Sequence, residues 1–445
     1  MATGTKRYRS LSTEAELVRG DASESGERGK RSQQRFSRVR SLARALAACE
    51  GGIVGVLVAA SFVSARLLPA ALVLAALFWG VRWLAYGRLT VPAPGAWPAV
   101  LLALLVPVTL WATALPEVTR PAVYQLLAGI ALYFAIVNWT ISQIRLKWVA
   151  LALVIGGLLL AFSAVVTVEW FPGTKLLFIP ADLYKRLPAP VTDPVHPNVM
   201  AGALVLLLPI ALARLAFPAP GLPRYERLVA GLAALSMTAV LVLTKSRGGL
   251  VAFAAALAAL CVLRWRRGWL AIAIAALAAG AGAWRIGLPR LVEALSATQT
   301  LGGLDGRLEV WSRAIYMLQD FPFTGIGMGT FKQVANAMYP FFLAGPNADV
   351  PHAHNLFLQV GVDLGLPGLV AYLALLLVTA WSLIMVLRRP ASFRWLAAGL
   401  LCSLVALCVH GLLDAAIWGT RPAILSWAIF GLAAAMANAA GTERT

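Results

Sequence analysis

The stretch WVALALVIGGLLLAFSAVV occupies residues 148–166 and contains no charged side chain. As an α-helix rising about 1.5 Å per residue, it spans roughly the 30 Å thickness of a bilayer's hydrocarbon core. In that environment every backbone N–H and C=O group needs a partner within the protein, which a helix provides along its own length. This segment therefore predicts a membrane-spanning helix.

Similar apolar runs recur along the 445 residues, of which 60% are hydrophobic and 13% are charged. A soluble globular chain carries about 25% charged residues, and the strands of a membrane barrel have only about ten residues. We therefore predict an all-α polytopic membrane protein with about twelve transmembrane helices. The predicted spans cover residues 50–66, 68–86, 96–114, 121–142, 146–166, 197–216, 226–243, 248–265, 268–286, 365–387, 395–413 and 421–440.

The net charge of +19 is unevenly distributed, because most lysines and arginines fall in the 1–49 tail and in loops on the same side of the predicted bundle. The positive-inside rule then predicts that both termini are cytoplasmic, and it explains the basic excess without a nucleic-acid partner. The 1–49 tail is polar, charged and poor in aromatic residues, which predicts disorder, with its basic second half near anionic lipid headgroups. Residues 50–445 form the predicted transmembrane domain.

Two long loops, at residues 167–196 and 287–364, fall on the outer side in this orientation, and the longer one separates spans 9 and 10. A loop this long in a compact protein is typical of a functional segment. The middles of the spans hold almost no ionisable residues, which argues against an ion-coupled carrier. We therefore expect any chemistry at the outer face, although a flippase with a polar groove remains open.

The short outer turn TKSRGGL, residues 244–250, carries Lys245 and Arg247 at the membrane boundary. One interpretation is that these side chains snorkel to anchor a helix end. The other is an anion site, because a guanidinium donates two parallel hydrogen bonds to a phosphate and the following helix N-terminus adds positive potential. The positive-inside rule disfavours cations on this side, which favours the anion site.

The segment GRLEVWSRAIYMLQDFPFTGIGMGTF, residues 306–331, has apolar residues at helical spacing. Its Arg307 and Arg313 are six positions apart and therefore need not project from the same face of that helix. Glu309 and Asp320 are alternative ion-pair partners for them. For Arg313 this structural role weighs at least as much as a functional one.

The segment VPHAHNLFLQVGVDLGLPG, residues 350–368, contains His352 and His354. A transition-metal site needs three or four protein ligands, and the neighbouring sequence offers only Asp349 and Asp363. We therefore predict no metal site here.

Two further interpretations remain for this cluster. Asn355 is suited to cap a helix that begins at Leu356, because its side-chain oxygen can accept from the first backbone N–H groups. A neutral imidazole, with an ordinary pKa of about 6.5, is suited to act as a general base near neutral pH.

The spacing of His354 and Asn355, nine residues, Gly365, two residues and Gly368 resembles the signature of bacterial O-antigen ligases of the WaaL type. This signature is specific for the wider O-antigen ligase/polymerase superfamily and less so for ligases among its members.

Two further blocks, at residues 245–253 and 306–331, resemble that superfamily, and the motif resemblance covers about residues 200–390. The rest of the chain resembles it by its layout of spans and by the long loop before the signature. The resemblance implies a glycosyltransferase with a GT-C-like architecture.

What the resemblance implies is transfer of a preassembled O-antigen glycan from undecaprenyl diphosphate to a sugar hydroxyl of lipid A–core, at the periplasmic face of the bacterial inner membrane. It assigns His354 as the catalytic base and places Arg247 and Arg307 on the diphosphate. It implies no metal ion, ATP or other cofactor. Residues with a possible secondary role are Arg313, Lys245, His352 and Asn355.

Three alternatives stay open. An O-antigen polymerase would use the same donor with a second lipid-linked glycan as acceptor. A protein O-oligosaccharyltransferase would deliver the glycan to Ser or Thr, and such relatives often carry an extra soluble C-terminal region. A flippase for lipid-linked glycans would need no general base.

Overall fold

The computed structural model describes residues 33–63, 65–140, 142–170, 182–183, 186–190, 194–217, 223–286, 304–343, 345, 348–389 and 393–442. These residues are predominantly helical, and their only bridge of β type joins Val168 to Val195 at the base of the 167–196 loop. The remainder of that loop lies largely outside the described residues. The chain is an all-α polytopic membrane protein.

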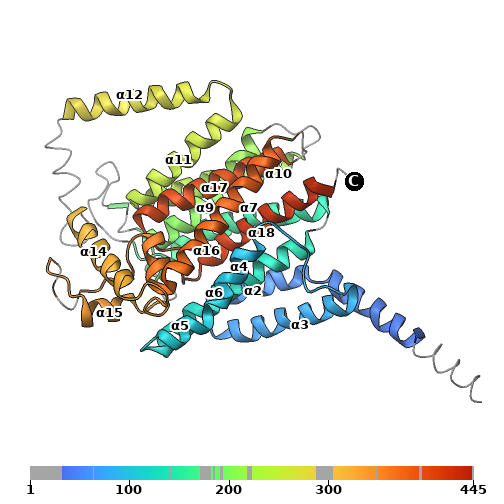
Figure 1. Cartoon of the computed structure of the whole chain (residues 1–445). Coiled ribbons are helices and arrows are strands. Elements are labelled where there is room, and N and C mark those ends of the chain that lie inside the picture. Colours follow the sequence, from blue (N-terminus) through green and yellow to red (C-terminus); the bar gives the residue numbers. More distant parts are fainter. Residues whose placement is uncertain are drawn as a thin grey trace, which may run out of the picture.

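Nine helices of the described residues are long and apolar enough to cross a membrane, and each coincides with one of the twelve predicted spans. They pack side by side as a bundle (Figure 1). The nine are α3 (Leu68–Tyr86), α6 (Pro116–Trp139), α7 (Gln143–Thr167), α9 (Pro197–Ala216), α10 (Arg224–Leu243), α11 (Arg247–Arg264), α16 (Leu356–Leu387), α17 (Arg394–Leu413) and α18 (Ala423–Thr442).

The predicted span 96–114 is helical but divided, into α4 (Ala96–Leu104) and α5 (Val106–Ala112). The division falls at Leu105, one residue before the first turn of α5, which contains Pro107. Proline has no N–H to donate and its ring clashes with the preceding turn, so an uninterrupted helix is disfavoured there.

The predicted disorder of the 1–49 tail does not extend to Gln33–Ala48, which form a helix bent by 47° from α2 (Gly51–Val63). This stretch is rich in Ala, Leu and Arg, which are strong helix formers. Two of its alanines also pack against α3. Residues 1–32 lie outside the described residues.

Four further helices belong to the transmembrane part and the outer loop. The ninth predicted span is α12 (Gly268–Ile286), which packs against α11 and diverges from the bundle (Figure 1). Its apolar part, Gly268–Gly282, is shorter than the nine full spans. The outer loop contains α14 (Leu304–Asp320) and α15 (Phe331–Met338), and the short 3-10 helix η1 (Ala65–Leu67) leads into α3.

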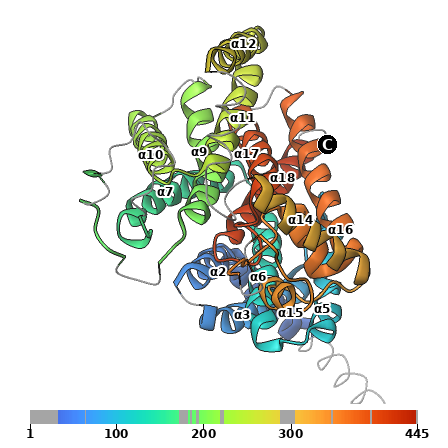
Figure 2. The ribbon, with the colours of Figure 1, turned by 90° about the vertical axis from the view of Figure 1, so that its left-hand side faces the viewer.

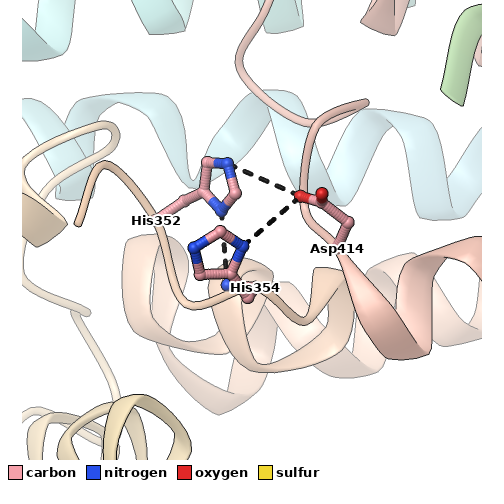
Figure 3. Close-up of side chains that lie close together, drawn as sticks. All are labelled: His352, His354 and Asp414. Carbon is pink, nitrogen blue, oxygen red and sulfur yellow. Dashed lines mark hydrogen bonds and ion pairs between the residues drawn. The ribbon is translucent and has the colours of Figure 1, made fainter. Parts of the chain in front are cut away.

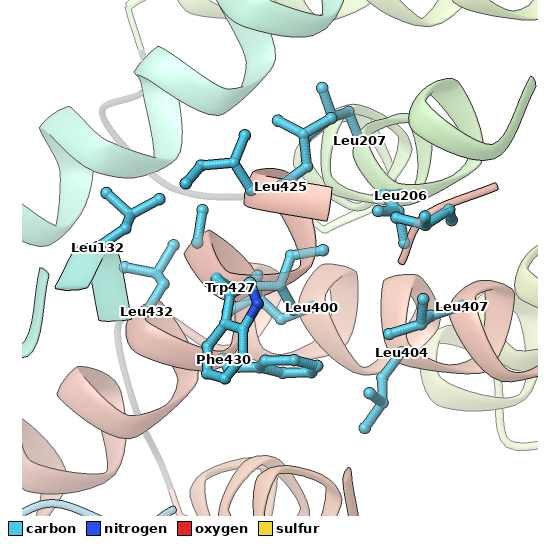
Figure 4. Close-up of a cluster of buried hydrophobic side chains, with 14 of the residues drawn as sticks. Leu132, Leu206, Leu207, Leu400, Leu404, Leu407, Leu425, Trp427, Phe430 and Leu432 are labelled. Carbon is cyan, nitrogen blue, oxygen red and sulfur yellow. The ribbon is translucent and has the colours of Figure 1, made fainter. Parts of the chain in front are cut away.

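The centre of the bundle is formed by α6, α9, α17 and α18, whose apolar side chains interdigitate (Figure 4). Helices at such an interface approach closely where one of them carries a small residue. Gly129 of α6 is such a position, because a Cβ atom there would lie only 2.1 Å from Cδ1 of Trp427 on α18.

We expect Gly129→Ala to lower the melting temperature of the purified protein, because overpacking of a tight interface costs about 1–3 kcal/mol. Gly156→Ala on α7 is the matched control, since its Cβ would meet no atom within 4 Å. There the better helix propensity of Ala predicts an unchanged or higher melting temperature. Equal melting temperatures for the Gly129 variant and wild type would contradict the packing shown in Figure 4.

The outer loop is fastened to the bundle where α16 breaks. Gly365 has φ 71° and ψ −176°, so residues 356–364 form a separate short helix before the main span. The backbone N–H of Leu366 donates to the carbonyl of Pro322 at 2.7 Å, and a Cβ on Gly365 would lie 2.7 Å from that oxygen. The glycine therefore allows the loop backbone to contact the break.

The break in α16 and the outer loop lie at one end of the bundle. The helices α14 and α15 lie at one end, and the described chain ends lie at the opposite end (Figure 1). Seen from the side of α14 and α15, α14 lies in front of α16, which it contacts (Figure 2). The beginning of α16 and the end of α17 meet at this same end of the bundle.

Candidate active site

Asn355 fixes the start of α16, as predicted. Its Oδ1 accepts from the N–H groups of Phe357 at 3.0 Å and Leu358 at 3.1 Å. Its Nδ2 donates to the carbonyl of Leu412 at 3.3 Å, near the end of α17. The cap therefore joins the segment that carries His352 and His354 to the end of α17.

The residue that follows α17, Asp414, lies beside both histidines and faces each of them (Figure 3). Its Oδ1 is 3.5 Å from Nε2 of His352 and 3.8 Å from Nδ1 of His354, and its side chain is 5% exposed. The two imidazole rings contact each other edge to face, with centroids 4.5 Å apart. The three side chains form one cluster, drawn from two helix ends.

The hydrogen bonds of His352 determine where its proton lies. Its Nδ1 accepts from the backbone N–H of His354 at 3.3 Å, so the proton is on Nε2, which faces Asp414. Burial lowers the pKa of His352 to about 4 although Asp414 opposes this shift. His352 is therefore neutral near pH 7.

Asp414 is the negative charge of the cluster. Burial acts to raise the pKa of this carboxyl, but the neighbouring His354, His352 and His410 imidazoles outweigh it and hold the pKa below its usual range. The separation from His354 is longer than a hydrogen bond, so the attraction acts across a small gap. An ionised Asp414 favours a proton on Nδ1 of His354, which leaves Nε2, the nitrogen turned away from Asp414, as the basic atom.

Two positions in the candidate site segments have a strained backbone conformation. Among the described residues, only two non-glycine residues have positive φ, His354 at 47° and Lys245 at 53°. Such conformations cost of order 1–3 kcal/mol and persist only where the surroundings hold them. The strained positions are the histidine of the cluster and a residue two before Arg247.

Arg307, on α14, is a cation that interacts electrostatically with Asp414 of this cluster. Burial lowers the pKa of its guanidinium, the Asp414 carboxylate raises it, and the Arg247 guanidinium lowers it. Arg307 is therefore within electrostatic reach of both residues. Arg307 thus interacts with Arg247 and with Asp414, the carboxylate beside His354, although these residues lie on separate helices or at their ends.

Two glycines allow the start of α11, which carries Arg247, to pack closely against α9 and α17. A Cβ atom on Gly249 would lie 2.9 Å from Cβ of Ala201 on α9, and one on Gly248 would lie 3.3 Å from Cβ of Leu413 on α17. The N-terminus of α11 therefore packs directly against both helices. Ser246 caps it by accepting from the N–H of Gly249 at 3.2 Å.

Arg313 is placed differently from the other arginines. Its Nη2 lies 3.4 Å from Oε1 of Glu309, its Nε donates to the carbonyl of Pro340 at 3.1 Å, and its guanidinium stacks 5.0 Å from the ring centroid of Phe342. These contacts stabilise the outer loop itself. Lys245 is buried in the turn before α11.

The sequence analysis did not identify Asp414 as a site residue, nor His410, whose imidazole influences the pKa of Asp414. His410 and Asp414 lie one helical turn apart at the end of α17, and both nitrogens of His410 have no hydrogen-bond partner among the described residues. His196, which caps α9 through its Nδ1, is the fourth histidine, and it influences the pKa of His352 together with His354 and His410. The sequence signal that could have identified His410 and Asp414 was that both lie near the end of a predicted span.

His352, His354 and Asp414 also have the composition of a metal site, because one ligand atom from each lies within 4.8 Å of the others. The count of ligands near the histidines in the sequence was incomplete, since the third comes from another helix. Metal–ligand bonds are about 2.0–2.2 Å for such donors, so this trio would have to contract slightly around an ion. Three such ligands fit a metal by type.

One comparison with known proteins covers the part of the chain that carries several residues of the candidate site. Residues 232–373 match the family model described as O-antigen ligase, a range that contains Arg247, Arg307 and His354. No curated protein matches the chain at a significant level. Residues 232–373 therefore carry a domain of the O-antigen ligase family, which supports a ligase- or polymerase-type function for this membrane protein.

Proposed function

We propose that the protein is an O-antigen ligase of the WaaL type. It transfers a preassembled glycan from undecaprenyl diphosphate to a sugar hydroxyl of lipid A–core. The observation that carries this proposal is the pairing of His354 with Asp414 beside Arg307, at the end of the bundle where the outer loop is fastened.

The proposed reaction is a single displacement. Nε2 of His354 takes the proton of the acceptor hydroxyl while that oxygen forms a bond to the anomeric carbon of the donor glycan. The bond from this carbon to the diphosphate oxygen breaks, and undecaprenyl diphosphate leaves with the electron pair. Asp414 stabilises the imidazolium that forms. No second carboxylate acts as a nucleophile, so the configuration at the anomeric carbon inverts.

Arg247 and Arg307 are proposed to bind the diphosphate. Negative charge accumulates on the leaving group, and fixed guanidinium groups stabilise it more in the transition state than in the bound donor. With two arginines in this role, the proposed reaction needs neither a metal ion nor a nucleotide. The polyprenyl chain would stay in the membrane beside the bundle.

The proposed location is the bacterial inner membrane, with both termini in the cytoplasm and the site facing the periplasm. The distribution of lysines and arginines supports this orientation. The described chain ends lie at the end of the bundle opposite α14 and α15, which agrees with an even number of crossings (Figure 1).

Arginine-to-lysine substitutions test the diphosphate contacts. We expect Arg247→Lys and Arg307→Lys to keep the charge but lower kcat/KM about 10- to 100-fold, because a lysine cannot form the two parallel hydrogen bonds. Arg313→Lys is the matched control and should retain near-wild-type kcat/KM, since its contacts lie within the outer loop. Full activity of both lysine variants would show that the arginines contribute only their positive charge and that the two parallel hydrogen bonds are not needed.

The acceptor is tested with purified protein and a defined undecaprenyl-diphosphate-linked glycan. Lipid A–core, a second lipid-linked glycan and a Ser/Thr peptide are offered in separate reactions, and products are identified by mass. A product on lipid A–core supports the ligase. A longer lipid-linked glycan would instead indicate a polymerase, and a glycopeptide would indicate a protein O-oligosaccharyltransferase.

A further inference from the structure

Asp363, in the short first part of α16, is a buried carboxylate that the proposed reaction does not use. It is 1% exposed and accepts three hydrogen bonds. Gln359 Nε2 donates to Oδ1 at 2.9 Å, the backbone N–H of Gly329 to Oδ1 at 3.2 Å, and Trp418 Nε1 to Oδ2 at 2.8 Å. These donors come from three separate segments of the chain.

The first of these segments leads to the general base. Oε1 of Gln359 accepts from the backbone N–H of Ala353 at 2.7 Å. Ala353 is fully buried and lies between His352 and His354 in the sequence. His354 has a positive φ. A hydrogen-bonded chain from Asp363 through Gln359 therefore holds the backbone of this strained segment.

The second segment leads to the carboxylate that faces the base. Trp418 lies four residues after Asp414, in the connection between α17 and α18. Its ring is fixed on Tyr372 of α16, with centroids 5.3 Å apart, and its backbone N–H donates to the carbonyl of Ala415 at 3.1 Å. The hydrogen bond from Trp418 to Asp363 therefore fixes the segment that begins at Asp414.

The third segment is the glycine-rich part of the outer loop. A Cβ on Gly325 would lie 2.5 Å from the carbonyl carbon of Asp363, so this loop contacts the α16 backbone directly. The N–H of Ile326 donates to the carbonyl of Val362 at 2.9 Å. The same carboxyl group therefore anchors the loop segment that follows α14, whose opposite end carries Arg307.

We propose that Asp363 is a positioning residue that sets the mutual geometry of His354 and Asp414 without contacting the substrates. This inference rests on the proposed function. Its chemical reason is that both carboxyl oxygens of Asp363 act as acceptors, and all three partners donate towards them. An amide of the same size would turn its NH₂ group towards at least one of those donors.

Asp363→Asn tests the proposal in the purified protein with the lipid A–core acceptor. We expect kcat to fall about 10- to 100-fold while the KM for the lipid-linked donor changes less than about twofold, because the diphosphate contacts remain. Trp418→Phe in the same chain removes the donor that faces the new NH₂ group while keeping an aromatic ring on Tyr372. The double variant should therefore be less impaired than the product of the two single effects.

Gly129→Ala is the control for general destabilisation, because it weakens the α6–α18 interface away from these residues. It should lower the melting temperature and leave kcat per folded molecule unchanged. A lower melting temperature with unchanged kcat in Asp363→Asn would overturn the positioning role. Multiplicative effects in the double variant, or a rise in KM alone, would also overturn it.

If Asp363→Asn does not fold, Trp418→Phe and Gln359→Met each remove one arm of the network and must by themselves lower kcat more than KM rises. Wild-type kcat in both would overturn the proposal. The proposed function fails separately, if the wild-type protein forms no product on lipid A–core or if His354→Ala retains full activity.

Discussion

Cells that depend on a His354→Ala variant are expected to accumulate lipid A–core without attached polymer. Removal of a general base that takes the acceptor proton costs typically 10²–10⁴-fold in rate, enough to eliminate the polymer ladder in a gel of lipopolysaccharide. The side chain is partly exposed and its truncation leaves the caps and core unchanged, so the variant protein should remain in the membrane at the wild-type level.

The comparison that gives this result its meaning is His352→Ala. His352 is neutral, and its Nε2 faces Asp414. It lies next to the proposed base His354 but takes no proton in the proposed reaction. It should retain a weakened ladder. A wild-type ladder in His354→Ala, with equal protein in the membrane, would remove His354 from the mechanism.

Asp414→Asn is expected to lower kcat about 100- to 1,000-fold with little change in KM. The amide keeps the size of the side chain but removes the charge that stabilises the imidazolium and that favours a proton on Nδ1 of His354. It also removes the carboxylate that attracts Arg307. The measurement is steady-state kinetics of the purified protein with a defined donor and lipid A–core.

Asp414→Glu separates charge from position in this prediction. The longer side chain restores the charge and can close the gap of 3.8 Å to Nδ1 of His354, so it should recover part of the lost rate. If Asp414→Asn turns over at the wild-type rate, the carboxylate has no part in the reaction.

The transmembrane architecture was predictable because each span is decided locally. A run of apolar residues must be helical in lipid whatever its neighbours are, and nine predicted spans match full helices. The N-cap at Asn355 was predictable for the same reason, since a cap depends on only three or four consecutive residues. The division at Leu105 was missed because hydropathy weighs proline lightly, whereas its missing N–H interrupts the helix.

The site was only half predictable, because its members come from different helix ends. His354 is recognisable from its own segment, but Asp414 is 60 positions further along the chain and looks like an ordinary polar residue at the end of a span. Only the packing of α16 on α17 places the two together. The resemblance assigned Arg307 to the diphosphate, whereas the role of Arg313 stayed open in the sequence. The contacts of Arg313 with Glu309 and Pro340 distinguish it as a residue of the loop.

The central claim is that protein side chains alone activate the acceptor and stabilise the leaving diphosphate. The most direct test follows both products of the purified protein in a metal chelator, with wild type and His354→Ala in parallel. The account predicts one undecaprenyl diphosphate released for each glycan joined to lipid A–core, at the same rate with and without chelator, and no release by the variant. Loss of transfer in chelator that an added divalent metal restores would contradict it, and would assign His352, His354 and Asp414 as metal ligands.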